Sequence, residues 1–188
     1  MKKLFLILIG IALLVASAIV QAQIVAPIGV GNLALKFDYI VFTDSYFDSS
    51  FNQDDGIYIG IEGYGKIASN IYLGGEIGQG ININLAGEDI NFVPVEVNIK
   101  YAREFEHNFV VDFGGGFSYS YAELTHQIIN QEVRNDWLFG GQIFADLGYK
   151  ISWFFAGINT KYQITQSFKD EGVNLNNFKL GAFIGIIL

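Results

Sequence analysis

The sequence predicts an all-β protein: an eight-stranded antiparallel up-and-down transmembrane β-barrel, preceded by a cleavable signal peptide. Three observations lead to this fold class. Eight segments alternate strictly between apolar and polar residues, which is the period of a strand. Long polar connections alternate with short ones along the chain. Charged residues make up only 16% of the 188 residues and aromatic residues 15%, which suits a β-rich protein in contact with lipid.

The first 22 residues form the expected signal peptide. Two lysines precede an almost uninterrupted apolar run over residues 4–20, and Val20 and Ala22 stand at positions −3 and −1 of a cleavage site after Ala22. An uncleaved membrane anchor is the alternative. Cleavage would leave a barrel domain of residues 23–188 and, by removing two lysines, change the net charge from −8 to −10. The absence of cysteine excludes disulfides and thiolate metal sites.

The first four segments with strand periodicity are residues 32–41, 56–67, 70–83 and 91–103. Apolar side chains occupy every second position, and polar or small residues lie between them. The apolar faces carry, in order, Leu33, Leu35, Phe37, Tyr39 and Val41; Ile57, Ile59 and Ile61; Ile71, Leu73, Ile77 and Ile81; and Val93, Val95, Val97, Ile99 and Tyr101. This period of two predicts strands and not helices.

The other four segments are residues 108–121, 136–149, 153–165 and 176–188. Their apolar faces carry Phe109, Val111, Phe113, Phe117 and Tyr119; Trp137, Phe139, Ile143 and Leu147; Phe154, Ala156, Ile158, Tyr162 and Ile164; and Phe178, Leu180, Ala182, Ile184, Ile186 and Leu188. Each segment is long enough for a tilted strand across a membrane, which needs about 9–11 residues.

The connections differ in length on the two sides of the expected barrel. The long polar connections are residues 43–55, 84–90, 122–135 and 166–175, and the short ones are 68–69, 104–107 and 150–152. Long loops at one end and short turns at the other are typical of an outer-membrane barrel. With both termini in the periplasm, the four long connections face outside.

The apolar face is predicted to lie outside the barrel, although a soluble lipocalin-like barrel would turn it inward. The interior of an eight-stranded barrel is only just wide enough for side chains, so the bulky face fits better outside. Aromatic residues also gather near both sets of strand ends, as in interfacial girdles. These are Tyr101, Phe105, Tyr149 and Trp153 at one end, and Tyr119, Tyr121, Trp137 and Phe168 at the other.

The last segment resembles the C-terminal signal read by the outer-membrane assembly machinery. The residues that carry this pattern are Lys179, Gly181, Ile184, Ile186 and Leu188. Proteins with this signal usually end on an aromatic residue, whereas this chain ends on leucine. The departure concerns the efficiency of insertion more than the fold.

Over residues 30–188 the chain resembles the small eight-stranded outer-membrane barrels of Gram-negative cell envelopes. This porin-like group includes OmpX-like and Opa-like proteins and the membrane domain of OmpA. Residues 137–150 and 177–188 carry most of the resemblance. The resemblance implies location in the outer membrane, contact with outer-membrane lipid and lipopolysaccharide, and insertion by the assembly machinery.

The polar face is expected to fill the lumen with an ion-pair network that closes the barrel to flow. Three glutamates on neighbouring segments, Glu62, Glu76 and Glu96, would face three lysines, Lys161, Lys179 and Lys36. Asp38, Lys100, Asp112 and Asp146 complete the set of ten. Buried charges are costly unless they are paired, so the two groups should meet. A proton or ion path through the same groups is the functional alternative.

The expected role is structural or surface-interactive, through acidic outer loops. The four long connections and their rims contain eleven acidic residues against Arg134 and Lys169. This balance is typical of a solvated surface or of contact with a host or envelope partner, and it argues against nucleic-acid binding. No cofactor, metal site or catalytic residue is predicted.

Two other functions stay open at this point. One is a narrow OmpW-like channel for small or apolar solutes. The other is a lipid A-modifying enzyme that would use His126 with Ser118, Ser120 and Asp136, although nothing in the sequence fixes their geometry.

Overall fold

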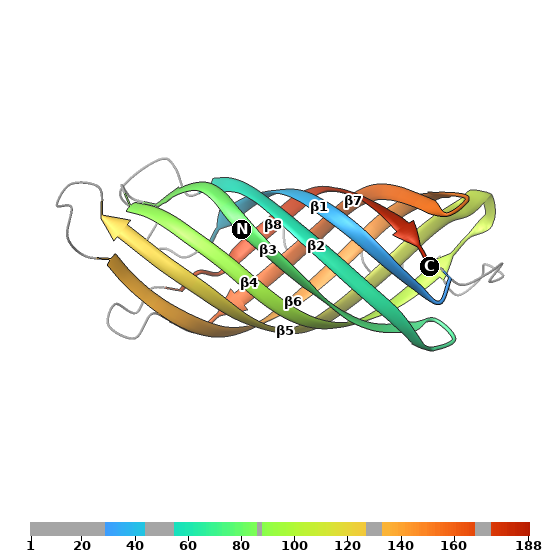
Figure 1. The fold of residues 1–188 in the computed structure, drawn as a ribbon, viewed down its shortest axis with the longest axis horizontal. Coiled ribbons are helices and arrows are strands. Elements are labelled where there is room, and N and C mark those ends of the chain that lie inside the picture. The colour runs from blue at the N-terminus through green and yellow to red at the C-terminus, as the bar shows by residue number, and fades with distance from the viewer. Residues whose placement is uncertain (1–28, 44–54, 86–87, 127–132, 168–173) are drawn as a thin grey trace, which may run out of the picture.

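The computed structural model describes residues 29–43, 55–85, 88–126, 133–167 and 174–188, which form one closed barrel (Figure 1). Its strands are β1 (Gly31–Phe42), β2 (Asp55–Ala68), β3 (Ile71–Leu85), β4 (Glu88–Glu104), β5 (Phe109–His126), β6 (Val133–Ile151), β7 (Phe154–Thr165) and β8 (Asn177–Ile187). One turn of 3-10 helix, η1 (Glu106–Asn108), joins β4 to β5. No helix among the described residues is long and apolar enough to cross a membrane. The expected signal peptide, residues 1–22, lies outside the described residues and stays a prediction.

Each strand pairs antiparallel with the next along the chain, and β8 pairs antiparallel with β1 to close the barrel. The closing ladder runs from Asn32↔Ile187 to Phe42↔Asn177. The chain ends continue it, because the Val30 amide donates to the Leu188 carbonyl oxygen at 3.0 Å. The eight-stranded up-and-down barrel predicted from the alternation is therefore confirmed.

The two faces of the strands have opposite chemistry, as the period of two predicts. On β1, Leu35 and Phe37 are exposed on the outer surface, whereas Lys36 and Asp38 are buried in the lumen. The same alternation holds around the barrel, and the outer surface reaches 67% exposure at Ile143 on β6. An outer surface this apolar is suited to lipid, and the inward-facing arrangement of a soluble lipocalin-like barrel is excluded.

Two of the long connections are shorter than expected. β3 continues to Leu85 and β4 begins at Glu88, so the connection expected at 84–90 is reduced to residues 86–87. The connection expected at 122–135 is reduced to residues 127–132. The reason is backbone pairing, which continues to Glu88↔His126 and Thr125↔Val133, beyond the end of the regular apolar alternation.

The extended strands make the barrel wall uneven in height. β4, β5 and β6 contain 17, 18 and 19 residues, whereas β1, β7 and β8 contain 12, 12 and 11. β5 and β6 project beyond β7 at the end of the barrel where β1, β3, β5 and β7 finish (Figure 1). This end is called the loop end below, and the opposite end is called the turn end.

Candidate functional site

The lumen is the candidate functional site, and a belt of charged side chains crosses its middle. This central belt consists of the ten residues predicted for the ion-pair network: Lys36, Asp38, Glu62, Glu76, Glu96, Lys100, Asp112, Asp146, Lys161 and Lys179. All ten face inward, and none is more than 5% exposed. The alternation of the strands puts them there, since each occupies a position of inward parity.

Lys161 connects the two sides of the central belt. Glu62, Glu76 and Glu96 are direct cross-strand neighbours on β2, β3 and β4, so three acidic groups stand in one row. Lys161 reaches this row from β7, with its Nζ 2.6 Å from Glu76 Oε2 and 2.7 Å from Glu96 Oε2. A buried lysine that binds two carboxylates offsets their mutual repulsion and its own loss of hydration.

Lys36 and Lys100 bind the rest of the acidic groups on the turn-end side of the belt. Lys36 Nζ lies 2.9 Å from Glu62 Oε2 and 3.4 Å from Asp146 Oδ2. Lys100 Nζ lies 3.1 Å from Asp112 Oδ2. Ion pairs thus link β1 to β2 and β6, β4 to β5, and β7 to β3 and β4. Longer contacts of Lys36 with Glu76 (3.7 Å) and of Lys100 with Glu62 (4.0 Å) join these pairs into one network of nine belt residues, which Asp38 does not enter through any ion pair among the described residues.

Lys179 is held differently from the other three lysines. Its nearest carboxylate oxygen, Glu96 Oε1, is 3.8 Å away, and its Nζ makes no hydrogen bond to any described residue. The ammonium group lies 3.7 Å from the centre of the Tyr58 ring, in the geometry of a cation–π contact. Lys179 was predicted both for the network and for the assembly signal. It lies where the belt meets the buried aromatic rings of Tyr58 and Phe92.

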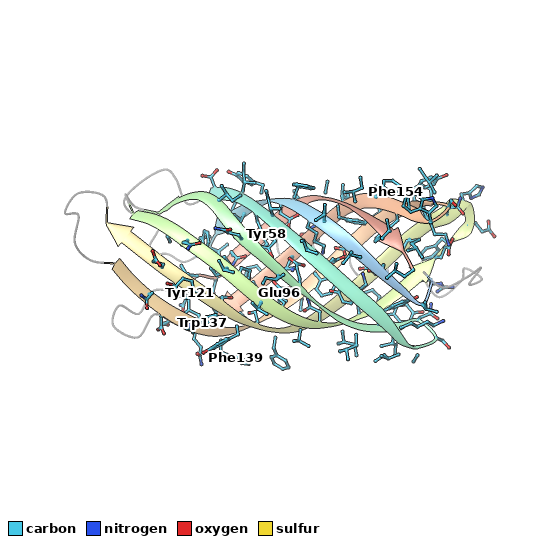
Figure 2. All side chains as sticks on the ribbon, in the orientation of Figure 1. Tyr58, Glu96, Tyr121, Trp137, Phe139 and Phe154 are labelled. Carbon is cyan, nitrogen blue, oxygen red and sulfur yellow. The ribbon has the colours of Figure 1, made fainter. Side chains whose placement is uncertain are left out.

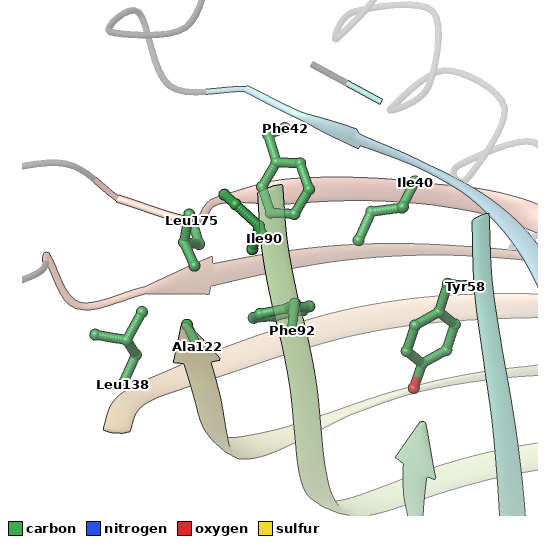
Figure 3. Packing of buried hydrophobic residues seen from close by; sticks show 8 residues of the cluster. All are labelled: Ile40, Phe42, Tyr58, Ile90, Phe92, Ala122, Leu138 and Leu175. Atoms are coloured by element: carbon green, nitrogen blue, oxygen red, sulfur yellow. The ribbon is translucent and has the colours of Figure 1, made fainter. Parts of the chain in front are cut away.

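An apolar cluster closes the lumen above the belt, at the loop end, and was missed by the sequence analysis. It consists of Ile40, Phe42, Tyr58, Ile90, Phe92, Ala122, Leu138 and Leu175, each at most 5% exposed (Figure 3). Phe42 and Phe92 pack edge to face at 5.9 Å. The signal in the sequence was the replacement of polar residues by apolar ones at inward positions near the strand ends. We call this group the loop-end plug.

Aromatic residues also close the turn end of the lumen. Tyr64, Tyr72, Ala102, Val110 and Phe144 form one cluster, and Ala34, Phe155 and Phe183 form another, with Ile187 packed against both. Lys100 lies 4.0 Å from the centre of the Tyr64 ring and Lys36 lies 5.6 Å from that of Phe144, so aromatic faces border the belt here too. These two clusters together are the turn-end plug.

Amide side chains add hydrogen bonds to the belt. Asn159 Nδ2 donates to Asp38 Oδ1 at 2.8 Å, and Asn98 Nδ2 donates to Glu96 Oε2 at 3.1 Å. Gln142 Nε2 in turn donates to Asn98 Oδ1 at 2.6 Å. Sequence reasoning missed these residues because an inward amide carries no charge pattern. They orient the carboxylates of Asp38 and Glu96 within the belt.

The serines considered for lipid A chemistry lie inside the barrel. Ser118 and Ser120 are buried in the lumen, and Gln163 Nε2 donates to their hydroxyl oxygens at 2.9 and 3.3 Å. The side chain of His126 lies outside the described residues. Asp136 binds the backbone amide of Trp137 at 2.8 Å. No described group of three His, Asp or Glu side chains is placed to hold a metal ion.

The outer surface carries aromatic residues near both ends. Tyr119 stacks on Trp137 at 4.8 Å near the loop end, and Phe109 packs on Tyr149 at 5.3 Å near the turn end. Tyr121, Trp137 and Phe139 lie toward one end of the barrel, and Phe154 lies toward the other (Figure 2). Phe109 and Tyr119 are ten residues apart on β5, or roughly 25 Å along the barrel axis at about 3.3 Å per residue and a tilt of about 40°. This matches the height of a membrane-spanning apolar band. Phe168, predicted for the same girdle, lies outside the described residues.

No protein-family model matches the chain, and no curated protein matches it. Several solved structures are similar. Neisserial surface protein A superimposes with a TM-score of 0.70 at 10% identity, over 84% of this chain and 97% of that one. The N-terminal β-barrel domain of Pseudomonas aeruginosa OprF gives 0.58 at 10% identity, over 85% and 98%. Ail, the attachment invasion locus protein of Yersinia pestis, gives 0.52 at 11% identity, over 83% and 97%. This chain therefore has the fold of the small eight-stranded outer-membrane β-barrels that its sequence resembles.

Proposed function

We propose that this chain is a non-conducting outer-membrane barrel that holds an acidic loop end at the cell surface for contact with a host or envelope partner. The observation that carries the proposal is the filling of the lumen. The loop-end plug, the central belt and the turn-end plug follow one another along the barrel, and their side chains are almost completely buried. A lumen filled in this way serves as the core of the protein.

The filling argues against the channel alternative. An eight-stranded barrel encloses only enough room for side chains, and both ends of this lumen are filled mainly by buried apolar and aromatic side chains. The charged groups between them are bound to one another within 2.6 to 4.0 Å. An ion that entered would have to break these pairs and displace packed aromatic rings.

The loop end supports the surface role. Its connections carry a large excess of acidic over basic residues, and the tall wall of β4 to β6 raises part of this surface beyond the apolar band. One of the similar structures is Ail in complex with the heparin analogue sucrose octasulfate, a polyanion. The acidic connections here would repel such a ligand and favour a basic partner or a cation-bridged lipopolysaccharide phosphate.

The conductance of single barrels in a planar bilayer tests whether the lumen is closed. We expect no discrete steps from the refolded protein. A double substitution in the loop-end plug, Phe42→Ala with Phe92→Ala, removes two rings from the lumen and should raise the leak. Phe113→Ala, on the lipid-facing surface, is the matched control and should leave the bilayer conductance unchanged. Regular conductance steps from the unsubstituted protein would refute a closed lumen.

The surface role has its own test. On intact cells, added protease should cut the chain within residues 43–54 or 166–174 and leave the strands protected. Complete protection of both connections would contradict display at the surface.

A non-enzymatic role also predicts that expression of the protein leaves the mass of lipid A unchanged. A mass change that His126→Ala abolishes would instead support the enzyme.

A further inference from the structure

Two aspartates of the central belt lie side by side on neighbouring strands. Asp112 on β5 and Asp146 on β6 are direct cross-strand partners, and both face the lumen. They are 4% and 5% exposed, and directly opposed side chains on neighbouring antiparallel strands have their Cβ atoms only about 4.5–5.5 Å apart. Two ionised carboxylates at this separation repel each other strongly in a buried site.

The neighbouring lysines satisfy only half of this pair. Asp112 Oδ2 is bound by Lys100 and Asp146 Oδ2 by Lys36. The two other oxygens, Asp112 Oδ1 and Asp146 Oδ1, have no hydrogen-bond donor among the described residues. A buried carboxylate oxygen without a donor is costly, and here two such oxygens belong to adjacent groups.

The charge of the belt points in the same direction. It contains six carboxyl groups and four lysines, so full ionisation would leave two uncompensated negative charges inside the barrel. Such an imbalance is expensive in a medium of low polarity. At least one additional positive charge is therefore needed where the lysines do not reach.

We propose that Asp112 and Asp146 form a proton-binding pair, in which one carboxyl group donates a hydrogen bond to the other and the barrel becomes sensitive to pH. One proton supplies the missing donor, removes the repulsion between the two groups and cancels one of the two excess charges. Paired carboxyl groups that share a proton titrate as a unit.

A proton fits this position better than a metal ion. Calcium and magnesium need six or more oxygen ligands, and no described group of three acidic or histidine side chains is placed to hold a metal. The ammonium groups of Lys36 and Lys100 also stand where further ligands would be required. Only the two Oδ1 atoms are left, and a single hydrogen between them satisfies both.

The groups that face the pair set the direction of the pH effect. Lys36 on β1 and Lys100 on β4 stabilise the ionised partner, whereas Glu62 on β2 adds negative charge. Glu76 on β3, 3.7 Å from Lys36 Nζ, adds a further negative charge, whereas Tyr64 beside Lys100 and Asn159, the β7 partner of Asp146, bring none at neutral pH. The folded protein thus retains a proton that two separate aspartates of an unfolded chain lose at about pH 4. Above about pH 4 the unfolded state binds fewer protons than the folded state. Stability therefore falls as the pH rises from about 4 to the value at which the folded pair loses its proton, and then levels off.

Infrared spectroscopy of the folded protein in lipid vesicles tests the proposal directly. The unsubstituted barrel should show the carbonyl stretch of a protonated carboxyl group at neutral pH. Asp112→Asn and Asp146→Asn should each remove the same component of this band, since either change leaves a single carboxylate beside a lysine. Asp38 is another buried carboxyl group of the belt, and any part of the band that arises from it would persist in both variants. Absence of the band from the unsubstituted protein would overturn the proposal without any variant having to fold.

Unfolding by urea at a series of pH values gives the second readout. The folding equilibrium constant of the unsubstituted barrel should fall by up to about tenfold per pH unit above about pH 4, where the unfolded aspartates have lost their protons, and should level off once the folded pair loses its own. Asp112→Asn should lack this dependence, and the matched control Asp136→Asn, whose amide oxygen still accepts the Trp137 N–H, should retain it. A metal cation is tested by replacing the salt of a bulky organic cation with sodium or potassium chloride at the same ionic strength. If this replacement stabilises the barrel and Asp112→Asn abolishes the gain, the pair binds a metal cation and the proposal is wrong.

Discussion

Lys161 Nζ lies 2.6 Å from Glu76 Oε2, although the two residues are on β7 and β3 and face each other across the lumen. The same nitrogen lies 2.7 Å from Glu96 Oε2. One lysine therefore compensates two buried carboxylates that adjacent strands hold side by side. No other lysine of the central belt has two contacts this short.

Lys161→Met should destabilise the folded barrel by about 3–5 kcal/mol, because it leaves two buried glutamates without their closest cation. The free energy of unfolding in urea, measured in lipid vesicles, checks this value. Lys66→Met is the matched control. Lys66 is half-buried near the turn end and has no ion pair among the described residues, so its replacement should change stability by about 0.5 kcal/mol or less. Equal stability of Lys161→Met and the unsubstituted protein would rule out the ion-pair network as a stabilising element.

Lys179→Met should cost much less than Lys161→Met, about 1 kcal/mol or below. The Lys179 ammonium group is completely buried, its shortest ion pair is 3.8 Å, and its contact with Tyr58 is with the ring face. A methionine keeps the packing and avoids the burial of a weakly paired charge. The comparison uses the same urea unfolding in vesicles. A loss as large as that of Lys161→Met would mean that Lys179 makes a strong ion pair in solution.

The period of two predicted the strands, their inward and outward faces and the ten residues of the belt, because parity alone decides which side of a sheet a residue occupies. The partners within the belt depend on strand register, which no single segment encodes. Lys36 thus reaches Asp146 on the far side as well as Glu62 on the next strand. The plugs were missed because residues such as Phe92 and Leu138 are apolar at inward positions. The greater length of β3, β4, β5 and β6 at the loop end was missed because their backbone pairing continues beyond the apolar alternation.

Phe92→Ala should destabilise the barrel by about 3–5 kcal/mol, since it leaves a cavity in the middle of the loop-end plug. Phe92 is completely buried and packs against Phe42. Phe117→Ala removes a ring of the same size from the lipid-facing surface, where lipid chains can fill the space, and should cost less. Urea unfolding of both variants in vesicles of one composition gives the comparison. Equal losses would indicate that Phe92 is not part of a packed core.

Gly181→Ala should impair folding for a steric reason. A methyl group at this inward position of β8 would overlap the carbonyl oxygen of Phe37 and the carboxylate of Asp38 on β1, at the seam that closes the barrel. At Gly141, on the outer face of β6, only the Gly116 carbonyl oxygen lies near, at 3.5 Å. Gly141→Ala should therefore fold normally. The fraction of refolded protein, read as the shift in gel mobility between boiled and unboiled samples, distinguishes them. Normal refolding of Gly181→Ala without any assembly factor would contradict the steric requirement. The glycine would then be explained by the predicted assembly signal alone.

Leu188→Phe separates assembly from stability. The Leu188 amide donates to the Gly31 carbonyl oxygen at 2.8 Å, and its side chain is 63% exposed on the outer surface, so a phenylalanine fits without a clash. Stability in urea should therefore change by about 0.5 kcal/mol or less. The assembly signal, however, usually ends on an aromatic residue, and the variant should insert faster into vesicles that contain the reconstituted assembly machinery. In vesicles without the machinery the two proteins should insert at equal rates. If the variant is faster in both, the gain comes from the aromatic ring at the lipid interface, and the departure at Leu188 has no bearing on recognition.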